Sequence, residues 1–236
     1  IGIQTFAKLR EEGCYYVDKT PLLLRLVREG SFYFLSRPRR FGKSLLIDTL
    51  AELFEGNRPL FDGLHAEANW DWSKSYPVIR ISFADGVLHS AERLQQRILD
   101  NLRQNAERLG VTFPPGLDVP GQFGELIRQA RASHGQRAVV LVDEYDKPIL
   151  DNITDGAIAR QMRDGLRDLY SVIKGQDAHI QFAMLTGVSK FSLFSGLNNL
   201  RDITVSADYS AICGYTDEDV DTVFAPELPG LDRAQI

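Results

Sequence analysis

Short apolar runs alternate along the chain with longer segments in which apolar residues recur at helical spacing. Four of the runs have the length and apolar content of buried strands: residues 32–35, 77–83, 138–142 and 180–185. The helical segments that follow them cover residues 43–54, 88–109, 123–131 and 158–173. A short fifth strand suits residues 203–205. This alternation predicts an α/β fold.

The remaining segments predict smaller elements. Thr20 followed by Pro21 predicts the N-cap and the first position of a helix near the start of the chain. Thr216 predicts the cap of a short last helix. Two stretches carry no clear period and are expected to be irregular: residues 57–75 and 145–155.

The junction between the first strand and its helix carries the strongest functional signal. A polar, basic loop ends there in Gly42, Lys43 and Ser44. The start of a helix has unpaired N–H groups and partial positive charge, so it attracts phosphate. Gly42 lets the backbone approach phosphates, Lys43 is expected to reach the β- and γ-phosphates, and the Ser44 hydroxyl is expected to bind Mg²⁺. A plain basic turn is the alternative, because Arg37 replaces the first glycine of the usual pattern.

Two acids, Asp143 and Glu144, directly follow the most apolar run of the chain. In phosphate-loop ATPases, a strand beside the loop ends in an acid that holds Mg²⁺, and a second acid can polarise the attacking water. Ligands of open parallel sheets bind at the carboxyl ends of strands, so these acids and Lys43 are expected to converge. A strand that stops in an acidic turn is the alternative. Thr186, at the next strand end, is a candidate for contact with the γ-phosphate or water, or for a turn.

Composition narrows the class of protein. The chain has 236 residues, a net charge of -5 and a pI near 5.4, which give no global attraction to nucleic acid. Cys14 and Cys213 lie far apart, which suits free thiols in a reducing cytoplasm. The four histidines show no metal-ligand spacing. No membrane-spanning run and no signal peptide are visible, so a cytoplasmic protein is expected.

Four motifs give the chain a family resemblance. In chain order they are Tyr16-Val17-Asp18-Lys19-Thr20, Ser36-Arg37-Pro38-Arg39-Arg40-Phe41-Gly42-Lys43-Ser44, Asp143-Glu144-Tyr145-Asp146-Lys147-Pro148 and Phe194-Ser195-Gly196-Leu197-Asn198-Asn199-Leu200. With them the chain resembles the AAA-ATPase-like domain often found upstream of a PD-(D/E)XK-type nuclease domain in bacterial proteins. The resemblance implies a RecA-like ASCE P-loop NTPase whose parallel sheet has about five strands in the order 5-1-4-3-2, flanked by helices.

The resemblance also implies a modified Walker A segment and a Walker B pair at Asp143 and Glu144. The nucleotide-binding residues would be Arg37, Pro38, Arg39, Arg40, Phe41, Gly42, Lys43 and Ser44. The expected cofactors are ATP and Mg²⁺, with Ser44 and Asp143 as metal ligands. The expected catalytic residues are Glu144, Lys43 and Thr186.

Three parts are expected along the chain: an N-terminal preface packed on the core at 1–30, the P-loop ATPase core at 31–206, and the start of a C-terminal lid or linker at 207–236. The chain begins with Ile1 and stops abruptly, so a longer protein is expected. No lysine has an acid two positions before it, as the nuclease site would need. Nuclease chemistry, and with it any contact with nucleic acid, is therefore expected from a missing C-terminal portion. An oligomer is possible.

Four functions compete on these motifs. The first is an ATPase whose hydrolysis moves the segment after Ser206 against the core. The second is a nucleotide-binding switch with little turnover that controls an attached domain. The third is a small-molecule phosphotransferase, which Glu144 argues against because it favours water as the acceptor. The fourth is direct nucleic-acid binding by Arg37, Arg39 and Arg40, which predicts a steep salt dependence.

Overall fold

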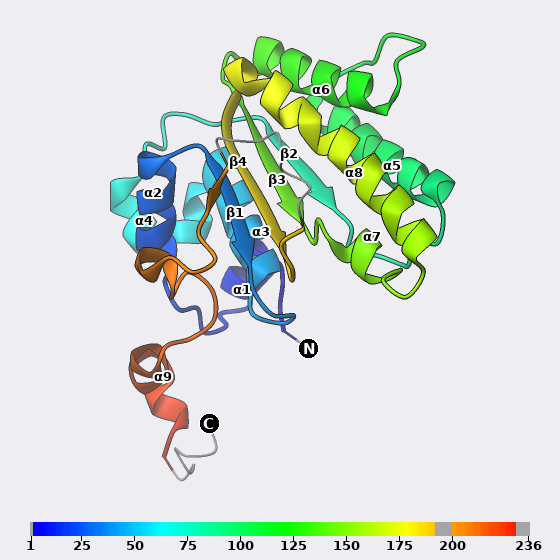
Figure 1. Ribbon diagram of the computed structural model, residues 1–236. Coiled ribbons are helices and arrows are strands. Elements are labelled where there is room, and N and C mark those ends of the chain that lie inside the picture. Colours follow the sequence, from blue (N-terminus) through cyan, green and yellow to red (C-terminus); the bar gives the residue numbers. More distant parts are fainter. Residues whose placement is uncertain (1, 192–199, 230–236) are drawn as a thin grey trace.

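A parallel five-stranded sheet organises the computed structural model, which describes residues 2–191 and 200–229 (Figure 1). The strands lie in the order β2-β3-β4-β1-β5, and every neighbouring pair is parallel. They are β1 (Phe32–Ser36), β2 (Val78–Ser82), β3 (Ala138–Asp143), β4 (Ile180–Gly187) and β5 (Arg201–Asp202). The predicted α/β class and strand order are confirmed.

Helices cover both faces of the sheet and make three layers (Figure 1). One face packs against α5 (Ala91–Leu109), α6 (Val119–His134) and α8 (Gly156–Gly175). The other face packs against α2 (Thr20–Glu29) and α3 (Lys43–Glu55). Side chains alternate between the faces along each strand, so Val140 joins the first core and Leu141 the second. Strands buried on both faces explain why the runs are almost continuously apolar.

Smaller elements surround these layers. A third apolar cluster joins Phe6, Leu53 and Phe61, and it packs the start of the chain against the outside of α3. The short elements that contribute to this cluster are α1 (Phe6–Glu11), η1 (Arg58–Phe61) and α4 (His65–Asn69). The other short elements are α7 (Lys147–Leu150), η2 (Asp177–His179), η4 (Ala207–Tyr209), α9 (Asp217–Val223) and η5 (Ala225–Glu227).

Several local predictions were wrong. Thr20 is the first residue of α2 and not its N-cap, because its hydroxyl accepts a hydrogen bond from the Ala66 amide instead. The fifth strand lies at Arg201–Asp202, two residues before the expected place, because pairing with β1 and not apolar content defines it. Short helices occur in both stretches expected to be irregular. Thr216 does cap α9, in a capping box with Asp219.

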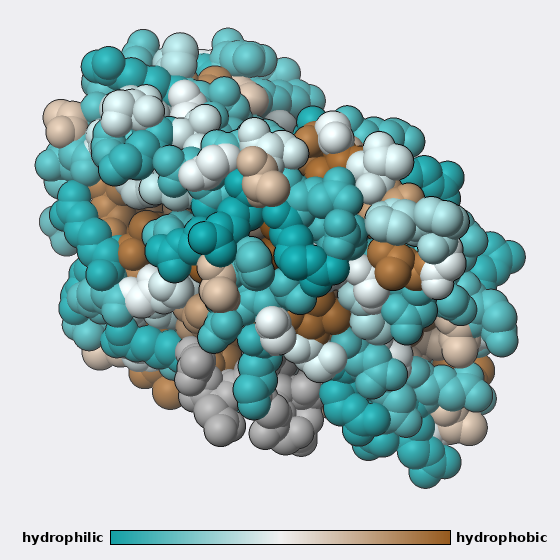
Figure 2. Space-filling model, turned by 90° about the horizontal axis from the view of Figure 1, so that it is seen from above, coloured by the Kyte–Doolittle hydropathy of each residue, from teal (hydrophilic) through white to brown (hydrophobic). Residues whose placement is uncertain are grey.

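The surface seen from above is largely hydrophilic, and the apolar residues on it are scattered among polar ones (Figure 2). In the ranges that the structure describes, no helix combines the length and the apolar character needed to cross a bilayer.

Candidate functional site

The loop between β1 and α3 ends in a backbone conformation suited to glycine. Gly42 has φ 86° and is the N-cap of α3. The first turn of α3 has no acidic residue, and no side chain of the described residues caps it. The N-terminal N–H groups of a 13-residue helix therefore face the loop without a built-in anion. This arrangement suits a phosphate-sized anion.

Lys43 is buried inside this loop, with 5% of its surface exposed. Its Nζ donates hydrogen bonds to the carbonyl oxygens of Arg37 at 3.0 Å and Pro38 at 2.9 Å. Burial lowers the pKa of Lys43, and the carboxylates of Asp143 and Glu144 oppose that shift most strongly. The ammonium group is thus held by the loop backbone and lies within electrostatic reach of both predicted acids.

Arg37, where a phosphate loop usually has glycine, has a structural role at the entrance of the loop. Its guanidinium donates to the carbonyl oxygens of Thr204 and Ser36, and its amide donates to the Gly187 carbonyl at 3.1 Å. Arg37 therefore ties the loop to β4 and to the segment after β5. The next four residues of the loop are exposed: Pro38, Arg39, Arg40 and Phe41.

The strand register brings the predicted polar residues to one edge of the sheet. Leu35 lies opposite Thr186 across β1 and β4, and Ser82 lies opposite Asp143 across β2 and β3. The Thr186 hydroxyl donates to Oδ1 of Asp143 at 2.6 Å. Ser44, in the first turn of α3, is partly buried next to Lys43. The carboxyl ends of β1, β3 and β4 therefore carry the loop, the acid pair and Thr186 together.

Glu144 adopts a left-handed backbone conformation, with φ 52°. Its amide donates to Oδ1 of Asp143 at 3.1 Å. Burial raises the pKa of the Glu144 carboxyl, and the charge of Asp143 adds to the rise. Lys147, Lys43 and Arg39 act in the opposite direction. A carboxylate with a raised pKa is a stronger base near neutral pH.

Sequence reasoning assigned no role to Tyr145 and Asp146, although both fall in a quoted motif. Oδ2 of Asp146 accepts hydrogen bonds from the amides of Val188 at 2.9 Å and Ser189 at 2.6 Å. The Tyr145 amide donates to the carbonyl of Thr186 at 3.0 Å. These bonds join the segment after the acid pair to the end of β4. Two polar side chains placed directly after the acids were the signal in the sequence.

Comparison with known families agrees with this geometry. The sequence profile of a family described as predicted AAA-ATPase matches residues 1–195. The chain belongs to the predicted AAA-ATPase family. It is 63% identical over 240 residues to an "uncharacterized protein in vnfD 5'region" from Azotobacter chroococcum mcd 1, and the match covers 100% of this chain and 46% of that protein. The chain thus spans about half the length of that relative. No solved structure matches it.

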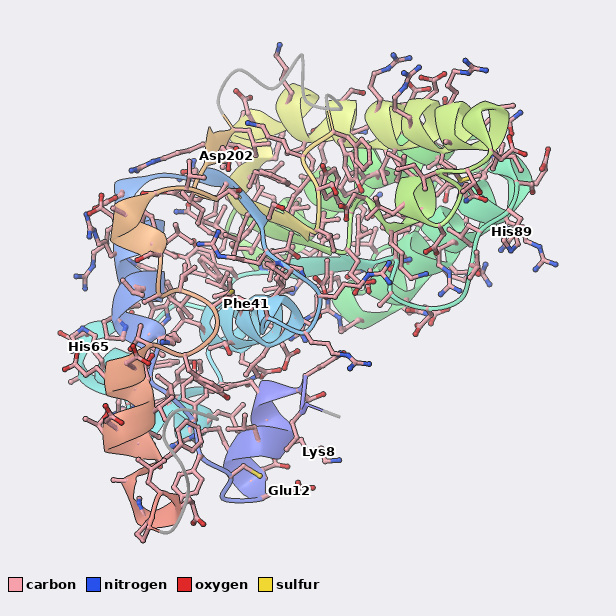
Figure 3. All side chains as sticks on the ribbon, turned by 60° about the horizontal axis from the view of Figure 1, so that its bottom comes forward. Lys8, Glu12, Phe41, His65, His89 and Asp202 are labelled. Carbon is pink, nitrogen blue, oxygen red and sulfur yellow. The ribbon has the colours of Figure 1, made fainter. Side chains whose placement is uncertain are left out.

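In this AAA-ATPase-family chain the loop between β1 and α3 also touches the segment that follows β5. Phe41 lies against the turn at Gly214 (Figure 3). Gly214 has φ +75°, and a Cβ there would come within 2.7 Å of the Phe41 ring. Cys213 is buried beside this turn, and burial raises the pKa of its thiol to about 12. The thiol is therefore protonated and unreactive near neutral pH.

Other candidate residues of the family chain lie outside this cluster. Arg201, near the end of the chain, forms an ion pair with Glu29 at 3.3 Å. His65 and His89 lie on opposite sides of the molecule (Figure 3). Among the described residues, no group of three or more histidine, cysteine or acidic side chains could hold a metal ion. The motif residues 194–199 lie outside the described residues.

Proposed function

We propose that this chain is an ATP-binding module that hydrolyses ATP with the help of Mg²⁺. The observation that carries the proposal is the shared environment of one cation and two acids. Lys43 is buried close enough to Asp143 and Glu144 for their charges to act on it. Burial lowers the pKa of Lys43, and these two carboxylates raise it. Family membership supports the same conclusion at the coarser level of a predicted ATPase.

In this proposal each residue has a distinct task. Lys43 and the open N-terminus of α3 bind the β- and γ-phosphates, where phosphate oxygens replace the two carbonyls that now accept from Lys43. Ser44 and Asp143 hold Mg²⁺, which neutralises charge on the phosphates when it is bound. These protein ligands are few, so nucleotide oxygens and water must complete the coordination shell.

The acid pair and Thr186 act on the attacking water. Glu144 accepts a proton from it, and its raised pKa suits that role. Thr186 holds Asp143 through the 2.6 Å hydrogen bond, and its hydroxyl is our candidate for contact with the γ-phosphate or the water. Arg39 and Arg40 are exposed on the loop and add positive charge for the phosphates.

Phosphate release by the purified chain tests hydrolysis. The wild type is compared with Glu144→Gln, which keeps the shape of the side chain and removes the base. A loss of about 10²- to 10⁴-fold in turnover is expected, because general-base catalysis contributes that much. Glu107→Gln, an exposed acid on α5, is the matched control and should keep wild-type turnover. Equal turnover in the wild type and Glu144→Gln would contradict the assigned base.

A nucleotide-binding switch with little turnover is the second candidate. Two observations favour it: Arg37 alters the entrance of the loop, and the chain covers 46% of its relative. We propose that the switch controls an attached C-terminal nuclease domain in a protein of that greater length. Tight ATP binding without phosphate release would favour this candidate. The division into preface, core and lid at residues 30 and 206, and a cytoplasmic location, belong to the same proposal.

A further inference from the structure

The two residues after Glu144 reach across to the loop that follows β4. Tyr145 is fully buried, and its hydroxyl donates to the Ser189 carbonyl at 2.8 Å and accepts from the Phe191 amide at 2.9 Å. Asp146 is 1% exposed, and its Oδ2 accepts from the amides at 188 and 189. We call these two side chains and their bonds the Tyr145–Asp146 clamp. Four hydrogen bonds of the clamp hold residues 188–191.

The clamp exists because the backbone turns at Glu144. Its left-handed conformation directs the following residues back toward β4, where the Tyr145 amide meets the Thr186 carbonyl at 3.0 Å. The space between them is tight. A Cβ at Gly187 would lie 2.5 Å from the Tyr145 ring and 2.6 Å from Oδ1 of Asp146. Only glycine fits between the clamp and the strand end.

Glu144 depends on this backbone for its orientation. Within the described ranges its carboxylate makes no hydrogen bond to a protein group, so its direction follows from its φ and from the bonds on either side. On one side it is joined to Asp143, and on the other the clamp fixes Tyr145. An acid that must meet a water molecule needs such outside support, because a misplacement of about 1 Å can cost 10²-fold in rate.

We propose that Tyr145 and Asp146 are positioning residues that orient Glu144 toward the attacking water and tie that orientation to the loop after β4. The inference rests on the proposed ATPase function. Neither residue touches the reacting atoms. Both act through the Glu144 backbone and the end of β4, so they set turnover and not nucleotide affinity.

Tyr145→Phe tests the proposal, because it removes the hydroxyl and keeps the ring that packs on Phe34 at 5.4 Å. We expect turnover to fall about 10-fold or more while KM for ATP stays unchanged. Tyr33→Phe is the matched control, since that buried hydroxyl also donates to a backbone carbonyl, that of Leu26 at 2.8 Å. The control should keep wild-type turnover. Thermal unfolding of both variants separates a loss of stability from a loss of turnover.

Gly187→Ala gives a second test, because the added Cβ would displace the Tyr145 ring and the Asp146 carboxylate from the end of β4. It should also lower turnover. Full turnover in Tyr145→Phe, or an equal loss in Tyr33→Phe, would overturn the clamp while the ATPase proposal stands. A wild type that binds ATP and releases no phosphate would also overturn it, since Glu144 would have no water to activate. A wild type that binds no ATP would overturn the proposed function itself.

Discussion

In the proposed ATP hydrolysis, Glu144 is the residue that activates water. It is half-buried, follows a metal-ligand candidate directly and occupies a conformation that few non-glycine residues adopt. Such strain persists only where the surrounding structure enforces it, and it gathers at functional sites. Here the bonds from Asp143 and Tyr145 enforce it. The strain and the raised pKa of the carboxyl together support a chemical role for Glu144.

The raised pKa of Glu144 gives a prediction about pH. A general base works only when it is deprotonated, so turnover should fall as pH drops through this pKa. Burial moves it above the ordinary value of 4.5, so the acid limb should have its midpoint above 4.5. Initial rates of phosphate release at saturating ATP, from neutral pH downward, measure the midpoint. Circular dichroism at each pH checks that the fold is intact, and a midpoint at or below 4.5 would count against the assignment.

At the scale of elements, α5 covers the edge of the sheet that β2 forms. Two asparagines one turn apart pair with the backbone of β2. Asn105 pairs with the amide and carbonyl of Arg80 at 2.8 and 2.7 Å, and Asn101 does the same with Ser82 at 3.0 and 3.2 Å. Four residues of helix rise about 6 Å. Two residues of strand advance about 6.6 Å, so the spacings match. The bonds satisfy an edge that could otherwise pair with another chain.

Asn105→Ala should therefore destabilise the fold. The change leaves the amide and the carbonyl of Arg80 without their partner in a largely buried setting, and each such group costs about 1–3 kcal/mol. We expect the free energy of unfolding to fall by about 2–4 kcal/mol in a urea titration. Gln104→Ala, the exposed neighbour on α5, should change it by less than about 0.5 kcal/mol. Similar values for the two variants would contradict this role of α5.

The elements show which features the sequence could predict. The four longer strands were predictable because burial on both faces demands continuous apolar runs. α3 ends at Gly56, which adopts φ 83°, the left-handed conformation in which helices commonly end. The lysine-bearing loop and the acid pair come together because both lie at the carboxyl ends of parallel strands, where such sheets bind their ligands. β5 was misplaced because two residues paired with β1 leave no apolar pattern.

Long-range hydrogen bonds account for the features that the sequence did not predict. Thr20 stands where an N-cap is expected, yet its hydroxyl accepts a hydrogen bond from the amide of Ala66, far along the chain. Tyr145 and Asp146 had no predicted partners, because the amides that they bind lie more than forty residues later. A local pattern carries no information about such partners, which only the folded sheet brings near.

At the scale of the whole molecule, the C-terminal segment returns to the start of the chain. Lys19 forms an ion pair with Asp219 at 2.7 Å, and both side chains are largely buried. The Tyr15 ring packs on Phe224 at 5.4 Å, and its hydroxyl donates to Glu227 at 3.0 Å. α9 otherwise stands apart from the three layers (Figure 1). Its attachment therefore depends on a few contacts with Tyr15 and Lys19.

Lys19→Met should loosen this attachment. It removes a charge-assisted hydrogen bond, which contributes about 1.5–3 kcal/mol. The amides of α9 should then exchange with deuterium about 10-fold faster or more, while those of β3 stay protected. Lys8→Met is the control, because its pair with Glu12 is exposed and 3.8 Å long. Unchanged exchange in α9 would show that other contacts hold the helix.

We propose that the lysine-bearing loop and the acid pair bind one triphosphate together. Titration of fluorescently labelled ATP into the wild type, Lys43→Ala and Asp143→Asn, each with and without Mg²⁺, tests it most directly. We expect Mg²⁺ to tighten binding to the wild type, Lys43→Ala to bind weakly in both conditions, and Asp143→Asn to lose only the Mg²⁺-dependent gain. Wild-type affinity in both variants, with or without Mg²⁺, would contradict a shared nucleotide site.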